Sequence, residues 1–164
     1  MPQDYSFDIT CGFDRQEFTN AIDQARREIT TRYDFKGVIA EISVSENDMV
    51  LHTESEYKLT ALIDMIESKL VKRDIPLSIL DKSKAVESAS GGTVKKHIGL
   101  IATLTPEQAK EISKKLRAEL PKIKPNIQGD TVRVFSKSKD DLQKAISILK
   151  HEFSGLPLHF DNYH

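Results

Sequence analysis

The chain carries an internal repeat, in which a helical stretch followed by a strand occurs twice. Residues 55–79 begin S-E-Y-K-L and end I-P-L-S-I, and residues 138–160 begin S-K-D-D-L and end L-P-L-H-F. The copies are offset by 83 residues at their start and by 81 at their end. A repeat at this spacing predicts two copies of one small domain rather than a short-period solenoid. Two adjoining sheets also offer ligand sites that neither copy has alone.

Each copy has the pattern of a small α+β domain. Alternating apolar residues predict strands and a period of 3.6 predicts helices, in the order strand, helix, strand, strand, helix, strand. This is the βαββαβ plan of ferredoxin-like and RNP-like domains, so the predicted fold class is α+β with two such domains in tandem. The predicted boundaries are 1–84 for the first domain, 85–93 for a linker with small polar residues and two glycines, and 94–164 for the second.

The composition favours a cytoplasmic protein. Cys11 is the only cysteine, so no internal disulfide can form, which is typical of a reducing compartment. The opening residues lack the positive and apolar regions of a signal peptide, and no apolar run is long enough to span a membrane. We therefore expect a cytoplasmic protein with no membrane partner.

Charge is divided unevenly between the two halves. The whole chain has a net charge of −1, which disfavours avid, unspecific nucleic-acid binding. Residues 1–84 hold 11 Lys/Arg against 16 Asp/Glu, and residues 85–164 hold 13 against 9. The basic second half is a weak indication of a phosphate-bearing ligand, and ordinary variation among solvated faces explains it equally well.

The sequence lacks the common catalytic and cofactor motifs. It contains no H-E-x-x-H, G-x-S-x-G, P-loop or G-x-G-x-x-G pattern. No basic residue closely flanks Cys11, which favours a structural role for this thiol, and the histidines near the end of the chain have irregular spacing. We therefore expect no catalytic residue, no metal site, no cofactor and no enzymatic activity.

The first candidate binding segment is T-R-Y-D-F-K-G, residues 31–37, which leaves a predicted helix and enters a strand. The fork of Arg32 can hold a phosphate, and Tyr33 and Phe35 alternate onto one face, where they could stack a base. Lys36, followed by a glycine, lets the backbone approach a ligand. The alternative is a strand edge whose aromatic rings cap the core and whose charges are solvated.

The second candidate is the pair Arg133 and Phe135. Val132 and Val134 supply the helix-covered face of their strand, so the alternating side chains point to the open face, where RNP-like domains place stacking rings. The RNP1 pattern itself is absent, and the first repeat has His52 where the second has Phe135. The alternative is that Phe135 packs at the junction between the halves.

A further set of basic residues lies on the third predicted helix and just after its end. An RNA backbone could contact this set, but glutamates at 107, 111 and 119 interrupt it, and a solvated face explains it better. Its members are Lys110, Lys114, Lys115, Arg117, Lys122 and Lys124.

Several of these segments together resemble the YajQ family of bacteria. They are S-F-D-I, N-A-I-D-Q-A-R-R-E-I-T-T-R-Y-D-F-K-G, T-E-S-E-Y-K-L, I-Q-G-D-T-V-R-V-F-S-K-S-K-D-D-L-Q and the terminal F-D-N-Y. The resemblance covers nearly the whole chain. It implies tandem RNP-like domains, with a variant in which the first strands are exchanged between the halves. That variant predicts that Phe7 and Ile9 share a core with Val132 and Val134.

The resemblance also implies a cytosolic, non-enzymatic nucleotide-binding protein. Reception of cyclic di-GMP and RNA binding are both associated with this family, which offers no universal set of site residues to transfer. Three functions therefore stay open: a receptor for a nucleotide or a cyclic dinucleotide such as cyclic di-GMP, an RNA-binding module using the open sheet faces, and a protein-interaction adaptor. Salt dependence separates the first two, because a ligand that contacts many cations is released more steeply by salt.

Overall fold

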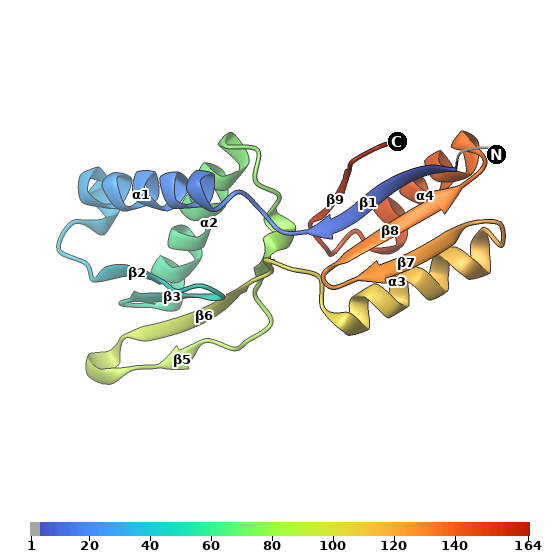
Figure 1. The fold of residues 1–164 in the computed structure, drawn as a ribbon. Coiled ribbons are helices and arrows are strands. Elements are labelled where there is room, and N and C mark those ends of the chain that lie inside the picture. The colour runs from blue at the N-terminus through green and yellow to red at the C-terminus, as the bar shows by residue number, and fades with distance from the viewer. Residues whose placement is uncertain (1–3) are drawn as a thin grey trace. The chain divides into compact units, whose positions relative to one another are not determined.

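The computed structural model describes residues 4–164, which form two compact units. The split unit consists of the described residues up to Gly12 together with Ala102–His164, and the continuous unit is Phe13–Ile101. Each unit contains one antiparallel sheet with two helices packed on it (Figure 1). The two separate sheets and four helices agree with the predicted tandem of ferredoxin-like domains.

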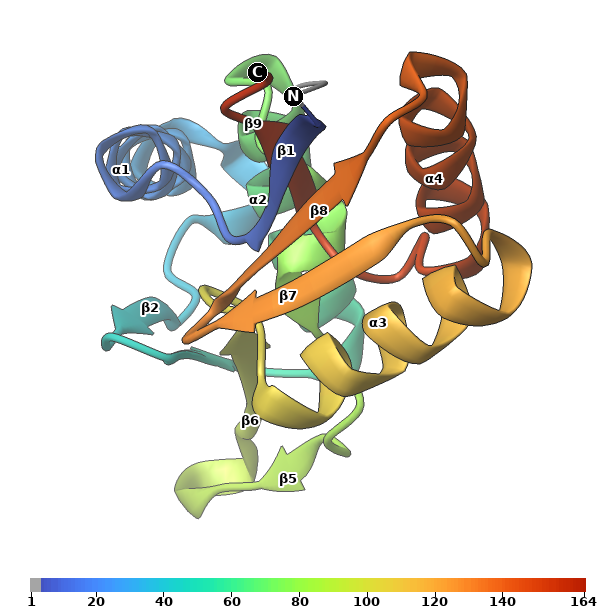
Figure 2. The ribbon, with the colours of Figure 1, turned by 45° about the vertical axis from the view of Figure 1, so that its right-hand side comes forward.

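The split unit is built around a four-stranded sheet in the order β7-β8-β1-β9. Helices α3 and α4 pack on one face of this sheet, which leaves the other face open (Figure 2). Its elements are β1 (Tyr5–Cys11), α3 (Pro106–Glu119), β7 (Lys124–Gln128), β8 (Thr131–Ser136), α4 (Lys139–Glu152) and β9 (Leu158–Asp161).

The continuous unit has the sheet order β2-β3-β6-β4, with β5 pairing on β6. Helices α1 and α2 pack against each other and against this sheet. Its helices and 3-10 turns are α1 (Arg15–Thr31), η1 (Tyr33–Phe35), α2 (Glu56–Lys72), η2 (Leu77–Ile79) and η3 (Ser90–Gly92). Its strands are β2 (Ala40–Val44), β3 (Asp48–Thr53), β4 (Leu80–Asp81), β5 (Glu87–Ser88) and β6 (Val94–Leu100).

Strand pairing crosses between the sequence repeats. The first strand of the chain, β1, pairs with β8 and β9, whereas the first strand of the second repeat, β6, pairs with β3 and β4. Phe7 lies opposite Val134 and Ile9 opposite Val132, and all four side chains are fully buried. The compact units change over after Gly12 and after Ile101, whereas the boundary predicted between the repeats lies at residues 85–93.

The segment expected as a linker contains secondary structure. Glu87 and Ser88 form the short strand β5, which pairs with Lys95 and Val94 of β6. Between the two strands, Gly91 and Gly92 have φ values of 73° and 75°, a left-handed conformation that costs glycine little. The Gly-Gly pair therefore makes the reversal that brings β5 back along β6.

The segment expected as the closing strand of the first repeat is mostly a 3-10 turn. Residues 77–79 form η2, with the amide of Ile79 donating to the carbonyl of Pro76, and only β4 continues as strand. Proline fixes φ near the helical value and so favours such a turn directly after it. The amide of Ile101 then donates to the carbonyl of Ile79, which ties this end of the sheet.

Candidate nucleotide-binding site

The β7–β8 hairpin positions the aromatic ring of Phe135 in the split unit. Its two-residue turn, Gly129–Asp130, joins Gln128 to Thr131, and Gly129 has a φ of 63°, as this tight turn requires. The register that follows places Lys124 directly opposite Phe135. The valines of β8 are fully buried under the helices, so Phe135 lies on the open face and is half-buried there, as the alternation in the sequence predicts.

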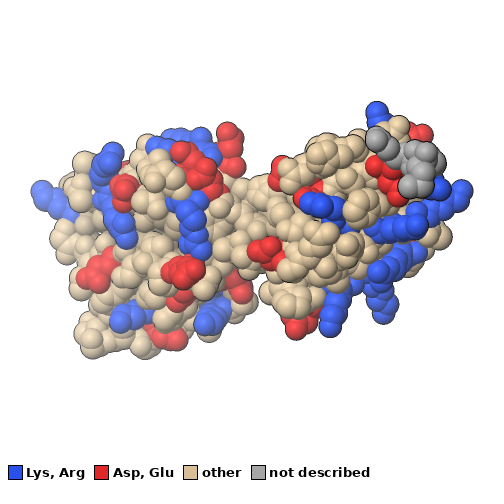
Figure 3. Space-filling model, viewed as in Figure 1, with Lys and Arg blue, Asp and Glu red and all other residues tan. Residues whose placement is uncertain are grey.

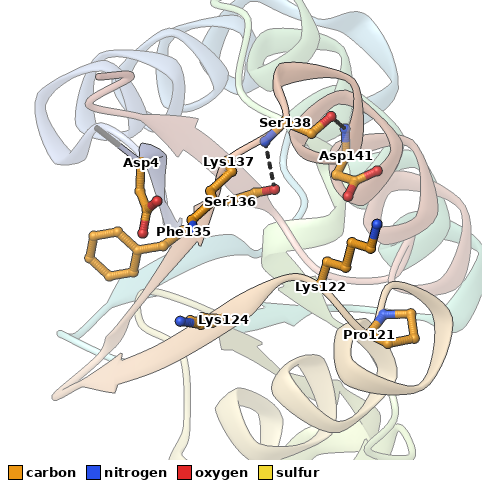
Figure 4. A pocket seen from close by; sticks show the side chains of 9 residues that line it. All are labelled: Asp4, Pro121, Lys122, Lys124, Phe135, Ser136, Lys137, Ser138 and Asp141. Carbon is orange, nitrogen blue, oxygen red and sulfur yellow. Dashed lines mark hydrogen bonds between the residues drawn. The ribbon is translucent and has the colours of Figure 1, made fainter. Parts of the chain in front are cut away.

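A pocket of about 310 Å³ opens beside Phe135. Strand β8, the loop that leads into α4, the start of β7 and the residue before β1 all contribute to it (Figure 4). Its volume is at the lower end of the range of small-molecule sites, about 300–1,000 Å³. The lining residues are Asp4, Pro121, Lys122, Lys124, Phe135, Ser136, Lys137, Ser138 and Asp141.

Lysines give this pocket its charge. Lys122, Lys124 and Lys137 line it, and no ion pair within residues 4–164 involves any of the three. Figure 3 shows Lys and Arg side chains gathered toward the end of the split unit where these loops lie. Asp4 and Asp141 oppose part of that charge. The lysines are therefore available to an anionic ligand next to an accessible ring.

The start of α4 is already capped by its own chain. The Ser138 hydroxyl accepts a hydrogen bond from the Asp141 amide at 3.3 Å, and the Ser138 amide donates to the Ser136 hydroxyl at 3.1 Å (Figure 4). These bonds satisfy groups that a helix end otherwise offers to an anion. In this pocket, the lysine side chains are thus the principal phosphate ligands on offer.

Arg133 is fixed to the sheet rather than free. Its Nε and Nη2 donate to the two carboxylate oxygens of Asp8 at 2.7 and 3.2 Å, and Asn162 Nδ2 donates to the same carboxylate at 2.9 Å. The hydrogen bonds from Arg133 hold the pKa of Asp8 below its usual value and raise the pKa of Arg133. Asp8 is 4% exposed, so the pair anchors the open face beside Phe135.

The Arg32 segment is arranged differently from the expectation. Residues 33–35 form the 3-10 turn η1 instead of entering a strand, so Tyr33 and Phe35 do not share a face. Tyr33 is 89% exposed, whereas Phe35 is 3% exposed and belongs to the core of the continuous unit. The strand prediction for these residues was wrong because local hydrogen bonds close a turn there. The Phe35 amide donates to the Arg32 carbonyl, and the Lys36 amide donates to the Tyr33 carbonyl.

The charges of this segment pair with one another. Arg32 donates from Nε and Nη2 to the Asp34 carboxylate at 2.9 and 2.7 Å, which lowers the pKa of Asp34 and raises that of Arg32. The Arg32 guanidinium and the Lys58 ammonium also lie over the Phe35 ring, 5.5 and 5.4 Å from its centre. The Phe35 ring therefore offers no open surface to a base, and Lys36 is exposed beside it.

The other potentially reactive side chains, Cys11 and His159, are buried or hydrogen-bonded to the backbone. Burial raises the pKa of the Cys11 thiol to about 11, which makes it a poor nucleophile. His159 Nε2 lies 2.8 Å from the carbonyl of Gly12 and donates to it. Across residues 4–164, no group of three or more His, Cys, Asp or Glu side chains could hold a metal ion, and no helix is long and apolar enough to cross a membrane.

The alternation along β8 predicted that Phe135 lies on the open face, but the pattern did not link this ring to the lysines of the pocket. Lys122 and Lys124 fall in the basic set on and after the third helix, and Lys137 is not part of that set. A signal was available, because the two-residue turn Gly129–Asp130 sets the hairpin register, and counting back from it pairs Lys124 with Phe135.

Comparison with known proteins identifies the family of the chain. The family model described as Nucleotide-binding protein YajQ-like matches residues 5–164. A protein of Synechococcus elongatus named as a nucleotide-binding protein is 44% identical over 158 residues, which is 96% of each chain. Others with that name, from Roseiflexus sp. and Trichodesmium erythraeum, are each 44% identical over 99% of both chains. The chain belongs to the YajQ-like family of nucleotide-binding proteins.

Proposed function

We propose that this protein binds a nucleotide on the open face of the split unit, without catalysing a reaction on it. The observation that carries the proposal is the half-buried ring of Phe135 in a pocket with Lys122, Lys124 and Lys137. A base can stack on the ring while a lysine ammonium pairs with its phosphate. RNP-like domains use this same face of the sheet for stacking.

The anchored pair Arg133–Asp8 supports this assignment. Both donors on one edge of the Arg133 guanidinium are bonded to Asp8. Arg133 therefore keeps a fixed orientation on β8, two residues before Phe135 and on the same face of the sheet. A fixed neighbour reduces the side-chain entropy lost when a ligand covers this face. Arg133 then acts as a positioning residue, and the lysines supply the charge.

Among ligand classes, we propose a small nucleotide first, with cyclic di-GMP as one specific candidate. The net charge of −1 and the two carboxylates in the pocket disfavour a long polyanion. RNA is the second candidate, and the three pocket lysines, which have no ion-pair partner among residues 4–164, favour it. Affinity for RNA should fall steeply between 50 and 200 mM salt, by about 10³–10⁵ for 6–10 phosphate contacts, whereas affinity for a single nucleotide should fall far less.

Calorimetric titration with AMP and with cyclic di-GMP tests the site. Phe135→Ala should weaken binding by about 1–3 kcal/mol, the usual contribution of one stacked base. Lys124→Ala should weaken it by roughly 1.5–3 kcal/mol if its ammonium holds the phosphate. The matched control is Tyr33→Ala, which removes a fully accessible ring from the continuous unit.

The same titration decides between the two candidate sites predicted from the sequence, residues 31–37 and the pair Arg133 and Phe135. Unchanged affinity in Phe135→Ala, with a loss in Arg32→Ala or Tyr33→Ala, would move the site to the continuous unit. Absence of binding of both ligands at millimolar concentration would contradict the proposal altogether. Turnover of a bound nucleotide at about 1 s⁻¹ or faster, abolished by one substitution, would contradict the non-catalytic role.

A further inference from the structure

A second pocket lies on the other side of the loop that forms the first. It has a volume of about 370 Å³ and is lined by Tyr5, Ser6, Lys139, Leu142, Gln143, Tyr163 and His164. Three pairs of consecutive residues divide between the two pockets: Asp4 with Tyr5, Ser138 with Lys139, and Asp141 with Leu142. The backbone at these three places therefore forms a ridge that separates the two pockets.

Two tyrosine rings give the second pocket the surfaces that a planar base needs. Tyr163 is 57% exposed, and its ring stacks on Phe7 with centroids 6.0 Å apart and an interplanar angle of 27°. That contact holds the ring while leaving much of it accessible. Tyr5 is 37% exposed, and the Lys139 ammonium lies 5.0 Å from the centre of its ring. The pocket therefore combines aromatic surface with a cation.

The ridge between the pockets carries positive charge. Lys137 lines the first pocket and Lys139 the second, with the capping residue Ser138 between them. No ion pair in the described part of the chain engages either lysine. Two base-sized pockets joined by a basic ridge match a chain in which a phosphodiester links successive bases.

We infer that the pocket of Tyr5, Lys139 and Tyr163 is a second base subsite, so that the two pockets together hold a linear dinucleotide. This inference rests on the proposed function, because the first base occupies the Phe135 pocket. The linking phosphate crosses the ridge beside Lys137 and Lys139. The second base then lies against the accessible surface of Tyr163. Stacking of this kind accepts any base, since every base has a π face.

The test compares AMP with its 5′-phosphorylated dinucleotide pApA by calorimetry on the full chain. The second base should make pApA bind at least about tenfold more tightly than AMP, within the range reported for one stacked base. Tyr163→Ala should reduce this advantage to less than about twofold and leave AMP affinity unchanged. Tyr163→Phe keeps the ring and should keep most of the advantage. Tyr57→Ala removes an 81% exposed tyrosine of the continuous unit and should change neither ligand.

The outcomes separate the two proposals. If AMP binding depends on Phe135 but pApA binds no more tightly than AMP, the second subsite is wrong and the first stands. If the pApA advantage survives in both Tyr163→Ala and Tyr5→Ala, the second base lies elsewhere and the inference is also wrong. If AMP binding does not depend on Phe135, the proposed function fails, and this inference fails with it. Thermal melting of each variant shows whether it is folded.

Discussion

The two sheets of this protein share a plan but present different open faces. Strand β8 and its counterpart β3 both bury alternate apolar residues, such as Val134 and Leu51. On the open face, the position of Phe135 in β8 is taken by His52 in β3. His52 Nδ1 lies 3.5 Å from the Glu41 carboxylate, and its Nε2 lies 2.8 Å from the Thr93 hydroxyl. The aromatic platform of one unit is thus replaced by an internally paired imidazole in the other.

Other polar side chains of the two units differ in the same way. In the continuous unit, His97 lies between Asp48 and Glu87, at 3.4 and 3.8 Å from their carboxylates. In the split unit, Lys124 lies opposite Phe135 without an ion-pair partner among the described residues. A face whose polar groups satisfy one another has little to offer a ligand, because binding must first break those contacts. The open face of the continuous unit is thus internally paired, whereas the split unit has lysines without ion-pair partners among residues 4–164 beside the Phe135 ring.

The largest expected effect comes from breaking the core of one unit only. Phe7 is fully buried in the split unit and contacts the rings of Phe160 and Tyr163. Phe7→Ala should lower the free energy of unfolding by about 3–5 kcal/mol. Hydrogen exchange should show amides of β1 and β8 losing protection while those of α1 and α2 keep it. Equal loss in both units would show that their stabilities are not separable.

Exchanging the two open-face residues tests the comparison itself. Phe135→His should weaken AMP binding by less than the roughly 1–3 kcal/mol expected for Phe135→Ala, because an imidazole still stacks but less well than a phenyl ring. The reciprocal His52→Phe should create no new site, since Glu41 lies opposite this position on β2, whereas Lys124 lies opposite Phe135 on β7. Calorimetry on both variants measures this. A gain of nucleotide binding by His52→Phe would show that an exposed ring is enough for binding and that the lysines beside Phe135 are not required.

The Asp8–Arg133 pair predicts an acid-sensitive contribution to the stability of the split unit. The folded-state pKa of Asp8 is below its ordinary 3.8, so the pair stabilises the fold fully above about pH 5 and loses this effect as the pH falls below 3.8. Asp8→Asn should cost ~1–2 kcal/mol at pH 7, near the lower end for charged hydrogen bonds, because the Arg133 side chain is 41% exposed. Urea unfolding should show a smaller difference between the two proteins at pH 3. A difference that grows on acidification would contradict this pairing.

The smallest expected effect is on Cys11, which reports on one unit alone. With a pKa of about 11 and 7% exposure, the thiol should react very slowly with a disulfide reagent at pH 8 in the folded protein and quickly in denaturant. Because Cys11 is the only cysteine and lies in β1, its labelling rate follows opening of the split unit. The rate should rise in Phe7→Ala and stay unchanged when Leu62→Ala weakens the continuous unit. A comparable rise in both variants would contradict this.

Much of the fold could be predicted because the repeat fixes the order of elements twice over. The alternation Val132–Phe135 also gave the correct face for the ring, since a strand has a side-chain period of two. Sequence could not show that the turn after Arg32 is a 3-10 helix with Phe35 buried, because aromatic alternation also fits a strand. Nor could it bring Asp4 to this pocket, because that depends on the long-range pairing of β1 with β8. Local pattern thus predicted the face of the ring and the lysine opposite it, whereas the long-range strand order was needed to complete the pocket.

The most direct test of the central claim is amide chemical-shift mapping during titration with AMP. A site on the open face of the split unit predicts the largest shifts in residues 122–124 and 135–141, which surround the pocket, with smaller ones at Asp8 and Arg133. Residues 32–37 and the His52 face of the continuous unit should stay unperturbed. Largest shifts at those positions, with none around Phe135, would contradict the account.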